Sequence, residues 1–195
     1  EAGGCPRADG RPGGVAGGAP GGVRVGGGGW RVLLLRSASG DDPVNALWLF
    51  DPGNREESLV VDPEELLAGN DPGDLPAAEL ARRERVRESG SGIVAYDALA
   101  DFSRVCFALD GRVFLAEVIL PGTSPGDAEP PPIRVVELPS TGDAFDPRLS
   151  PDGAAVAYVS GSSLRVTGTG GDRHLIGGST PTVSWGSAEY IAAEE

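Results

Sequence analysis

Short hydrophobic segments separated by turn residues recur along the sequence from Trp30 onward. Most of these segments are 5 to 7 residues long, rich in Val, Leu, Phe and Tyr, and bounded by Gly, Pro, Asp or Ser. They read WRVLLLR, ALWLFD, SLVVD, GIVAY, RVCFAL, RVFLAEV, IRVVEL, AVAYVS and SLRVTG. Runs of this length and composition are typical of β-strands. The pattern therefore predicts an all-β fold.

Two turns connect neighbouring segments. Asp110 and Gly111 stand between RVCFAL and RVFLAEV, and Asp-Gly suits the positive φ angles of a tight primed hairpin turn. The other turn is SPDG, Ser150 to Gly153, in which proline fixes φ, aspartate caps the backbone and glycine takes the left-handed position. We expect antiparallel strands on both sides of each turn.

An internal repeat is visible when RLSPDGAAVAYV, from Arg148, is aligned with RVGGGGWRVLLL, from Arg24. The alignment matches Arg24 with Arg148, Val25 with Leu149, Gly29 with Gly153, and Val32 with Val156. The offset of 124 residues is close to three times the roughly 40-residue period of propeller blades. A degraded third copy is expected at SRVCFAL, Ser103 to Leu109. Together these features predict a partial β-propeller, that is, its first few four-stranded antiparallel blades.

One segment departs from the β pattern. LPAAELARRERVRE, Leu75 to Glu88, has a proline near its start, strong helix formers throughout and SGSG directly after it. Because its apolar positions are few, we expect one inserted helix that lies on the surface or lines a pocket.

The first 29 residues differ in composition from the rest. They contain 13 of the 31 glycines and almost no large apolar side chain, so they cannot bury enough surface to offset the entropy of ordering. We expect a largely disordered head over residues 1–29 and a β domain over 30–195. A phosphate-binding loop would need a strand before the glycines and a helix after them, and neither pattern is present. No nucleotide cofactor is expected.

The charge and the cysteine content exclude several classes of function. A net charge of -13 repels phosphate backbones and anionic lipids, and the apolar runs are far shorter than the roughly 20 residues of a membrane span. No nucleic-acid or membrane partner is therefore expected. Cys5 and Cys106 lie far apart in different contexts, which disfavours a disulfide. With His174 as the one histidine and no C-x-x-C motif, no metal site is expected.

GTSPG, Gly122 to Gly126, matches the G-x-S-x-G pattern of a catalytic serine. That motif needs a helix directly after the serine. Pro125 and the following DAEPPP cannot begin one, so Ser124 is not expected to be catalytic. His174 lies in a strand-like RHLI and is expected to be structural or exposed. We expect no catalytic residue in this chain.

Two charged clusters each allow two interpretations. The first cluster is Arg82, Arg83, Arg85 and Arg87, interleaved with glutamates. It forms either a solvated helix face with i,i+4 pairs or a site where one guanidinium binds a carbonyl or carboxylate. The second, Glu194 and Glu195, is either solvated or captures a protonated α-amine, which both carboxylates can reach only from a helical turn. The residues alone leave both choices open.

Several strings together resemble the dipeptidyl peptidase IV group of the prolyl oligopeptidase family, namely the N-terminal β-propeller of its bacterial and cytosolic-type members. They are RRERVRESGSGIVAYD from Arg82, FDPRLSPDGAAVAYVS from Phe145 and SWGSAEYIAAEE from Ser184. In that family a helical arginine segment precedes a G-I-x-x-Y strand, a D-P-x-x-S-P-D-G blade follows, and a double-glutamate motif comes next. The order and approximate spacing agree over about residues 30–195.

The resemblance implies a role in releasing N-terminal dipeptides, with Pro or Ala in the second position. Glu194 and Glu195 match the pair that binds the free N-terminus of the peptide, and one of Arg82, Arg83, Arg85 and Arg87 would bind a backbone carbonyl, which one being left open. The Ser-Asp-His triad would lie in an α/β-hydrolase domain that this sequence lacks, so the chain alone is expected to be inactive. The resemblance also allows a homodimeric parent and implies a bacterial cytoplasmic location, with a signal peptide ahead of Glu1 left open.

A non-enzymatic propeller is the alternative. Periplasmic WD40-like propellers share the S-P-D-G turn and use their face to bind proteins. The dipeptidyl peptidase family also usually has an S-P-D-G-like turn in its first blade, whereas this chain has GGGG at Gly26 to Gly29. The first blade is therefore the part of the expected propeller that most needs a structural test.

Overall fold

The structure is a computed structural model of the 195-residue chain. It describes residues 21–26, 28–39, 41–42, 44–53, 55–68, 92–118, 133–178, 183 and 185–186. The statements below concern these residues.

The described chain forms three four-stranded antiparallel sheets and one short helix. Sheet 1 contains β1 (Gly21–Val25), β2 (Val32–Ser37), β3 (Asn45–Asp51) and β4 (Glu56–Val61). Sheet 2 contains β5 (Tyr96–Ala98), β6 (Arg104–Leu109), β7 (Arg112–Val118) and β8 (Ile133–Leu138). Sheet 3 contains β9 (Ala144–Leu149), β10 (Ala155–Ser160), β11 (Ser163–Gly168) and β12 (Arg173–Gly177). Each strand pairs with its neighbour in sequence, which is the meander of a propeller-type blade.

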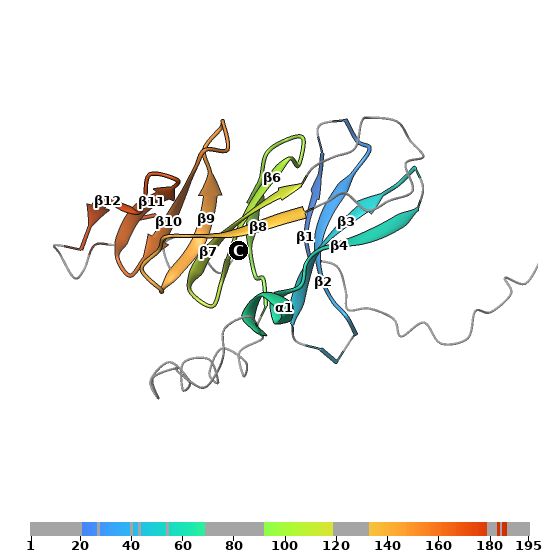
Figure 1. The fold of residues 1–195 in the computed structure, drawn as a ribbon, viewed down its shortest axis with the longest axis horizontal. Helices are drawn as coiled ribbons and strands as arrows, with labels where there is room; N and C mark the ends of the chain where they lie inside the picture. Colours follow the sequence, from blue (N-terminus) through green and yellow to red (C-terminus); the bar gives the residue numbers. More distant parts are fainter. Residues whose placement is uncertain are drawn as a thin grey trace, which may run out of the picture.

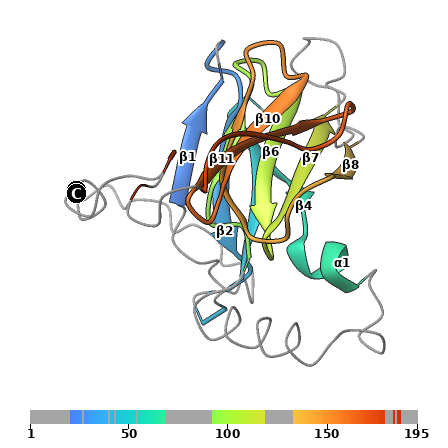
Figure 2. The ribbon, with the colours of Figure 1, turned by 90° about the vertical axis from the view of Figure 1, so that its left-hand side faces the viewer.

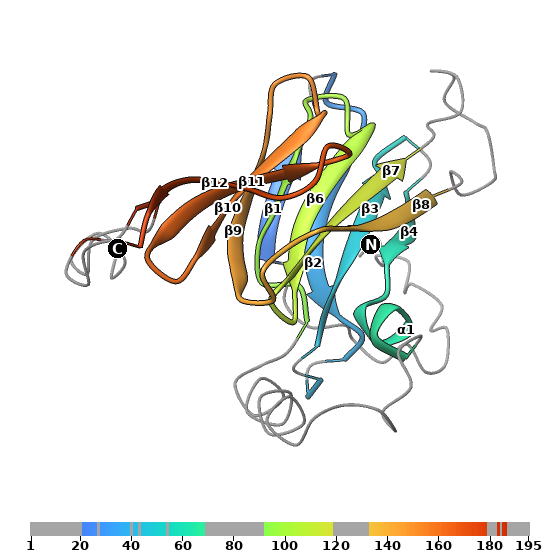
Figure 3. The same ribbon diagram turned by 60° about the vertical axis from the view of Figure 1, so that its left-hand side comes forward.

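The three sheets lie side by side in chain order (Figures 1 and 3). Figure 2 shows β1 on one side of the molecule and the last strands β4 and β8 on the opposite side. The first strands of the three sheets, β1, β5 and β9, are called the inner strands below. This arrangement confirms the predicted all-β, partial propeller-type fold.

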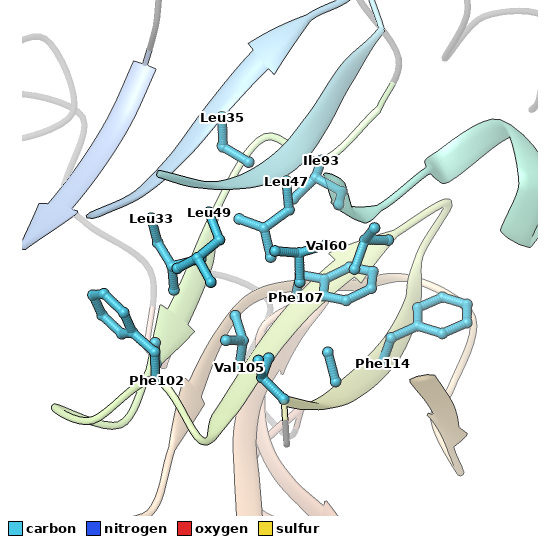
Figure 4. Close-up of a cluster of buried hydrophobic side chains, with 14 of the residues drawn as sticks. Leu33, Leu35, Leu47, Leu49, Val60, Ile93, Phe102, Val105, Phe107 and Phe114 are labelled. Carbon is cyan, nitrogen blue, oxygen red and sulfur yellow. The ribbon is translucent and has the colours of Figure 1, made fainter. Parts of the chain in front are cut away.

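Two hydrophobic clusters join the sheets face to face. The larger one fills the space between sheets 1 and 2, where side chains such as Leu33, Leu47, Val105 and Phe107 point toward one another (Figure 4). The second joins sheets 2 and 3 through residues that include Cys106 and Tyr158. Because successive side chains of a strand point to opposite faces, β6 supplies both clusters. This explains why RVCFAL is apolar at consecutive positions and does not alternate.

The internal repeat predicted from the sequence is present in the structure. Inner strands pair with second strands at the same offset in each sheet: Val25 with Val32, Ala98 with Val105, and Leu149 with Val156. The connecting turns also share two backbone hydrogen bonds. In sheet 1 these are Gly29 N to Gly26 O and Gly26 N to Arg31 O, and the same pair recurs at Phe102 and Leu99 and at Gly153 and Ser150. All three sheets thus contain one repeated turn.

The GGGG turn of sheet 1 therefore replaces SPDG without changing the turn. Gly29 and Gly153 have φ angles of 71° and 67°, and Phe102, at the same place in sheet 2, has 60°. The turns of sheets 3 and 2 are also capped by a side chain, which the glycines of sheet 1 cannot provide. Asp152 Oδ1 accepts a hydrogen bond from Ala154 N, and Asp101 Oδ1 accepts one from Ser103 N. The first blade is thus a regular member of the repeat.

The hairpin turn at Asp110 and Gly111 is confirmed, with φ angles of 52° and 73° between paired Leu109 and Arg112. The boundary of the β domain, in contrast, was placed too late. Residues 21–25 form β1 within the segment expected to be largely disordered. β1 was missed because its glycines hide the pattern, and it is stabilised by pairing with β2.

The one helix in the described part of the chain was not predicted. α1 (Pro63–Ala68) follows Asp62, whose carboxylate accepts hydrogen bonds from the N–H groups of Glu64 and Glu65. An Asp N-cap with proline at the first helical position is a recognisable start signal, and Leu66 and Leu67 pack against the larger cluster. The helix expected at Leu75 to Glu88 lies outside the described residues.

Candidate functional site

The inner strands of all three sheets meet at the side chain of Asp97. Its Oδ1 forms an ion pair with Nη1 of Arg24 on β1, and its Oδ2 accepts a hydrogen bond of 2.9 Å from the backbone N–H of Leu149 on β9. Burial raises the pKa of Asp97, but the hydrogen bonds from Arg24 and Leu149 outweigh burial and hold the pKa below its usual range. The charged carboxylate of Asp97 therefore connects the three sheets.

Tyr96, one position earlier on β5, links sheet 2 to the first two strands of sheet 1. Its hydroxyl lies 2.6 Å from the carbonyl oxygen of Gly22 and 3.0 Å from that of Leu33. Burial raises the pKa of this hydroxyl to about 12, against a smaller lowering by the charge of Arg24. The hydroxyl consequently stays protonated and donates to sheet 1 at any physiological pH.

The residues before Tyr96 fix the path of the chain into sheet 2. Gly92 forms an isolated parallel bridge with Asn45, and the N–H of Ile93 donates to the Asn45 carbonyl. A Cβ on Gly92 would lie 2.5 Å from the Asn45 nitrogen, and φ is +120°, so only glycine fits. Ile93 is fully buried in the larger cluster. GIVAYD belongs to one of the strings that carry the family resemblance, and here it attaches the chain entering sheet 2 to sheet 1.

A shallow, open cavity of about 320 Å³ lies beside Gly92 to Asp97. Its lining comes from the inner strands of all three sheets, the segment entering β5 and one residue of β2: Gly22, Val23, Arg24, Leu35, Val94, Ala95, Tyr96 and Arg148. Two arginines, Arg24 and Arg148, therefore line one cavity. We call it the axial cavity.

A β-bulge directs Arg148 toward the axial cavity. Asp146 and Pro147 together lie opposite Tyr158, where the register of β9 with β10 shifts, and Asp146 has a φ of 47°. Proline is tolerated here because β9 is an edge strand of its sheet. The same bulge occurs in β1, where the register shifts at Gly22, whose φ is 54°.

The structure does not describe the binding residues that were predicted from the sequence. Glu194, Glu195, Arg82, Arg83, Arg85 and Arg87 lie outside the described residues, as does Ser124. His174 is described, is exposed on β12, and its Nε2 lies 3.2 Å from the Gly177 carbonyl oxygen. Cys106 is a free buried cysteine, and burial raises the pKa of its thiol to about 12.

The axial cavity was not predicted, although part of its signal was present. The repeat alignment matched Arg24 with Arg148, which the structure places on corresponding inner strands. The sequence alignment did not include Asp97, which occupies the corresponding position of the degraded copy in sheet 2. A charged residue at one repeat position in every blade was the signal that could have identified the cavity.

No group of His, Cys, Asp or Glu side chains within the described ranges is arranged to hold a metal ion. The same part of the chain contains no helix long and apolar enough to cross a membrane.

Comparison with known proteins gives a distant structural likeness to several solved structures. No family model matches the sequence. A solved structure from an analysis of two prolyl endopeptidases, concerned with inter-domain dynamics in catalysis and specificity, aligns with 83% of this chain at 16% identity and a TM-score of 0.27. The chain spans 29% of the length of that structure. The fold assignment accordingly rests on the strand order and register of the chain itself.

Proposed function

We propose that this chain is the substrate-positioning part of a propeller-containing serine exopeptidase that releases dipeptides from peptide N-termini. In this proposal Glu194 and Glu195 bind the protonated α-amine, and one of the four arginines between Arg82 and Arg87 binds a backbone carbonyl of the peptide. A separate α/β-hydrolase domain would supply the nucleophile. The chain would then contribute the positioning of the peptide and not the bond cleavage.

The observation that carries the proposal is the place of GIVAYD in the fold. In the family that the sequence resembles, this string follows the arginine segment. Here Gly92 to Asp97 enters the inner strand of sheet 2, and Val94, Ala95 and Tyr96 line the axial cavity. Arg87 precedes Gly92 by five residues, a stretch that spans at most about 18 Å. The place of GIVAYD beside the axial cavity thus supports the proposal.

The test varies the amine of the substrate and the two glutamates together. In the protein joined to its hydrolase domain, Glu194→Gln with Glu195→Gln should raise KM for Ala-Pro p-nitroanilide about 10- to 100-fold, since charge-assisted hydrogen bonds to the amine are lost. The adjacent exposed pair Glu64 and Glu65 of α1 provides a matched control, and Gln at both should leave KM unchanged. An unchanged kcat/KM in the Glu194 and Glu195 variant would exclude the amine-binding role.

The arginines are tested one at a time. Among Arg82→Gln, Arg83→Gln, Arg85→Gln and Arg87→Gln, we expect one variant to raise KM by about tenfold and the other three to have little effect. Equal kinetics for all four would indicate a solvated helix face.

A protein-binding propeller is the second candidate, favoured by the SPDG turn. That turn has the geometry that WD40-like propellers also use, with Gly153 N donating to Ser150 O at 2.8 Å. Absence of any dipeptide release by the protein joined to its neighbouring domain would favour this candidate.

A further inference from the structure

We propose that the axial cavity binds the carboxylate of a peptide or small organic acid, with Arg148 as the anchoring side chain and Arg24 as a second donor. The family resemblance assigns no role to Arg24 or Arg148. The proposal does not depend on the peptidase function proposed above.

The size and lining of the axial cavity suit a small ligand. A volume of about 320 Å³ falls within the range of small-molecule sites, which are mostly apolar with a few placed polar groups. Val23, Leu35 and Val94 provide apolar walls, and the two arginines provide the cations. A guanidinium carries five N–H donors in a planar fork that matches a carboxylate.

The two arginines differ in how firmly they are held. Arg24 is tied to Asp97, whose side chain is only 16% exposed and also accepts from the Leu149 backbone. Arg148 pairs with Asp146 at 2.7 Å, but these side chains are 62% and 39% exposed, and an ion pair in water is weak. An incoming carboxylate can therefore replace Asp146 at Arg148, while Arg24 remains in place and offers its other N–H groups.

The position of Asp146 supports its role as a competitor for Arg148. The two residues are separated by one position on β9, across the bulge that gives Asp146 a φ of 47°. Asparagine tolerates this backbone conformation and has no charge. Asp146→Asn should therefore release Arg148 without disturbing β9. The affinity of the cavity for a carboxylate is then expected to increase.

The experiment titrates the full chain with N-acetyl-tetraalanine carrying a free C-terminal carboxylate, with its C-terminal amide, and with succinate, and measures Kd by calorimetry. Acetylation removes the α-amine, so failure here does not bear on the amine-binding glutamates. We expect the peptide acid to bind at least about tenfold more tightly than the amide, because the charged hydrogen bonds are lost in the amide. Succinate that binds as tightly as the peptide acid would assign the site to free small acids, and weaker succinate binding would assign it to peptide termini.

Three variants make the test specific. Arg148→Gln should weaken binding of the acid about tenfold, and Asp146→Asn should tighten it. Arg173→Gln, which removes the same charge from an exposed position on β12 of the same sheet, should leave Kd unchanged. Thermal unfolding curves check that each variant is folded. The proposal is overturned if acid and amide bind equally, if Arg148→Gln and Arg173→Gln have equal effects, or if Asp146→Asn does not tighten binding.

Discussion

At the scale of the residue, the side chain of Asp97 holds the three sheets together. One carboxylate neutralises Arg24, accepts from the Leu149 backbone and thereby connects β1, β5 and β9. Its neighbour Tyr96 connects the same β5 to sheet 1. Neither role could be predicted from the sequence, because both depend on inner strands that lie far apart in the chain and meet only in the folded sheets.

The lowered pKa of Asp97 predicts a pH-dependent contribution to stability. Because the pKa is lower in the folded than in the unfolded state, the charged carboxylate stabilises the fold at neutral pH, and this stabilisation is lost as the pH falls below about 4. Asp97→Asn should lower the free energy of unfolding by about 1 kcal/mol at pH 7, a modest figure because Arg24 is 46% exposed.

Urea unfolding between pH 7 and pH 3 measures this effect. The difference between wild type and Asp97→Asn should shrink over the acid part of this range, whereas Asp41→Asn, at an exposed loop position, should match wild type throughout. A difference that stays constant down to pH 3 would show that the Asp97 charge does not stabilise the fold.

At the scale of the element, the repeated turn after each inner strand allows a comparison between two glycines. Gly29 and Gly153 have nearly the same φ, so alanine at either position should cost about 1 to 2 kcal/mol for the left-handed backbone alone. A Cβ at Gly29 meets nothing within 4 Å, but at Gly153 it would lie 2.9 Å from Cδ of Arg104 and 3.0 Å from Cδ1 of Leu99.

Gly153→Ala should therefore be more destabilising than Gly29→Ala, by about 1 kcal/mol or more, since crowding is added to backbone strain. Unfolding midpoints of the two variants measure the difference. Equal losses would mean that Arg104 and Leu99 move aside freely and that the contact between sheets 2 and 3 is loose at this turn.

The sequence predicted elements best where local chemistry decided their conformation. Asp110-Gly111 and SPDG dictate their own φ angles, and apolar runs such as RVCFAL identify strands buried on both faces. β1 was not recognised as a strand, because its glycines hide the pattern that pairing with β2 enforces. The axial cavity was beyond reach for the same reason, since it forms between elements.

At the scale of the whole molecule, sheet 2 couples the other two sheets. Its β6 directs Val105 and Phe107 into the cluster shared with sheet 1, and Cys106 into the cluster shared with sheet 3. Phe107 and Phe114 stack with ring centroids 5.4 Å apart within the first of these clusters. A sheet buried on both faces cannot lose either neighbour without exposing apolar surface to water. The three sheets should therefore unfold as one cooperative unit.

Cys106, in the cluster between sheets 2 and 3, and Trp48, on β3 of sheet 1, provide two separate reporters of this unit. Burial raises the pKa of the Cys106 thiol to about 12, so in the folded chain at pH 8 it should not react with a disulfide reagent. Trp48 reports on sheet 1 once the exposed Trp30 and Trp185 are replaced by Phe, and Cys5→Ser leaves Cys106 as the one thiol. In urea, thiol reactivity and Trp48 fluorescence should change at the same midpoint. An earlier Trp48 transition would show that sheet 1 separates first, and that the Asp97 and Tyr96 contacts are too weak to couple it to sheets 2 and 3.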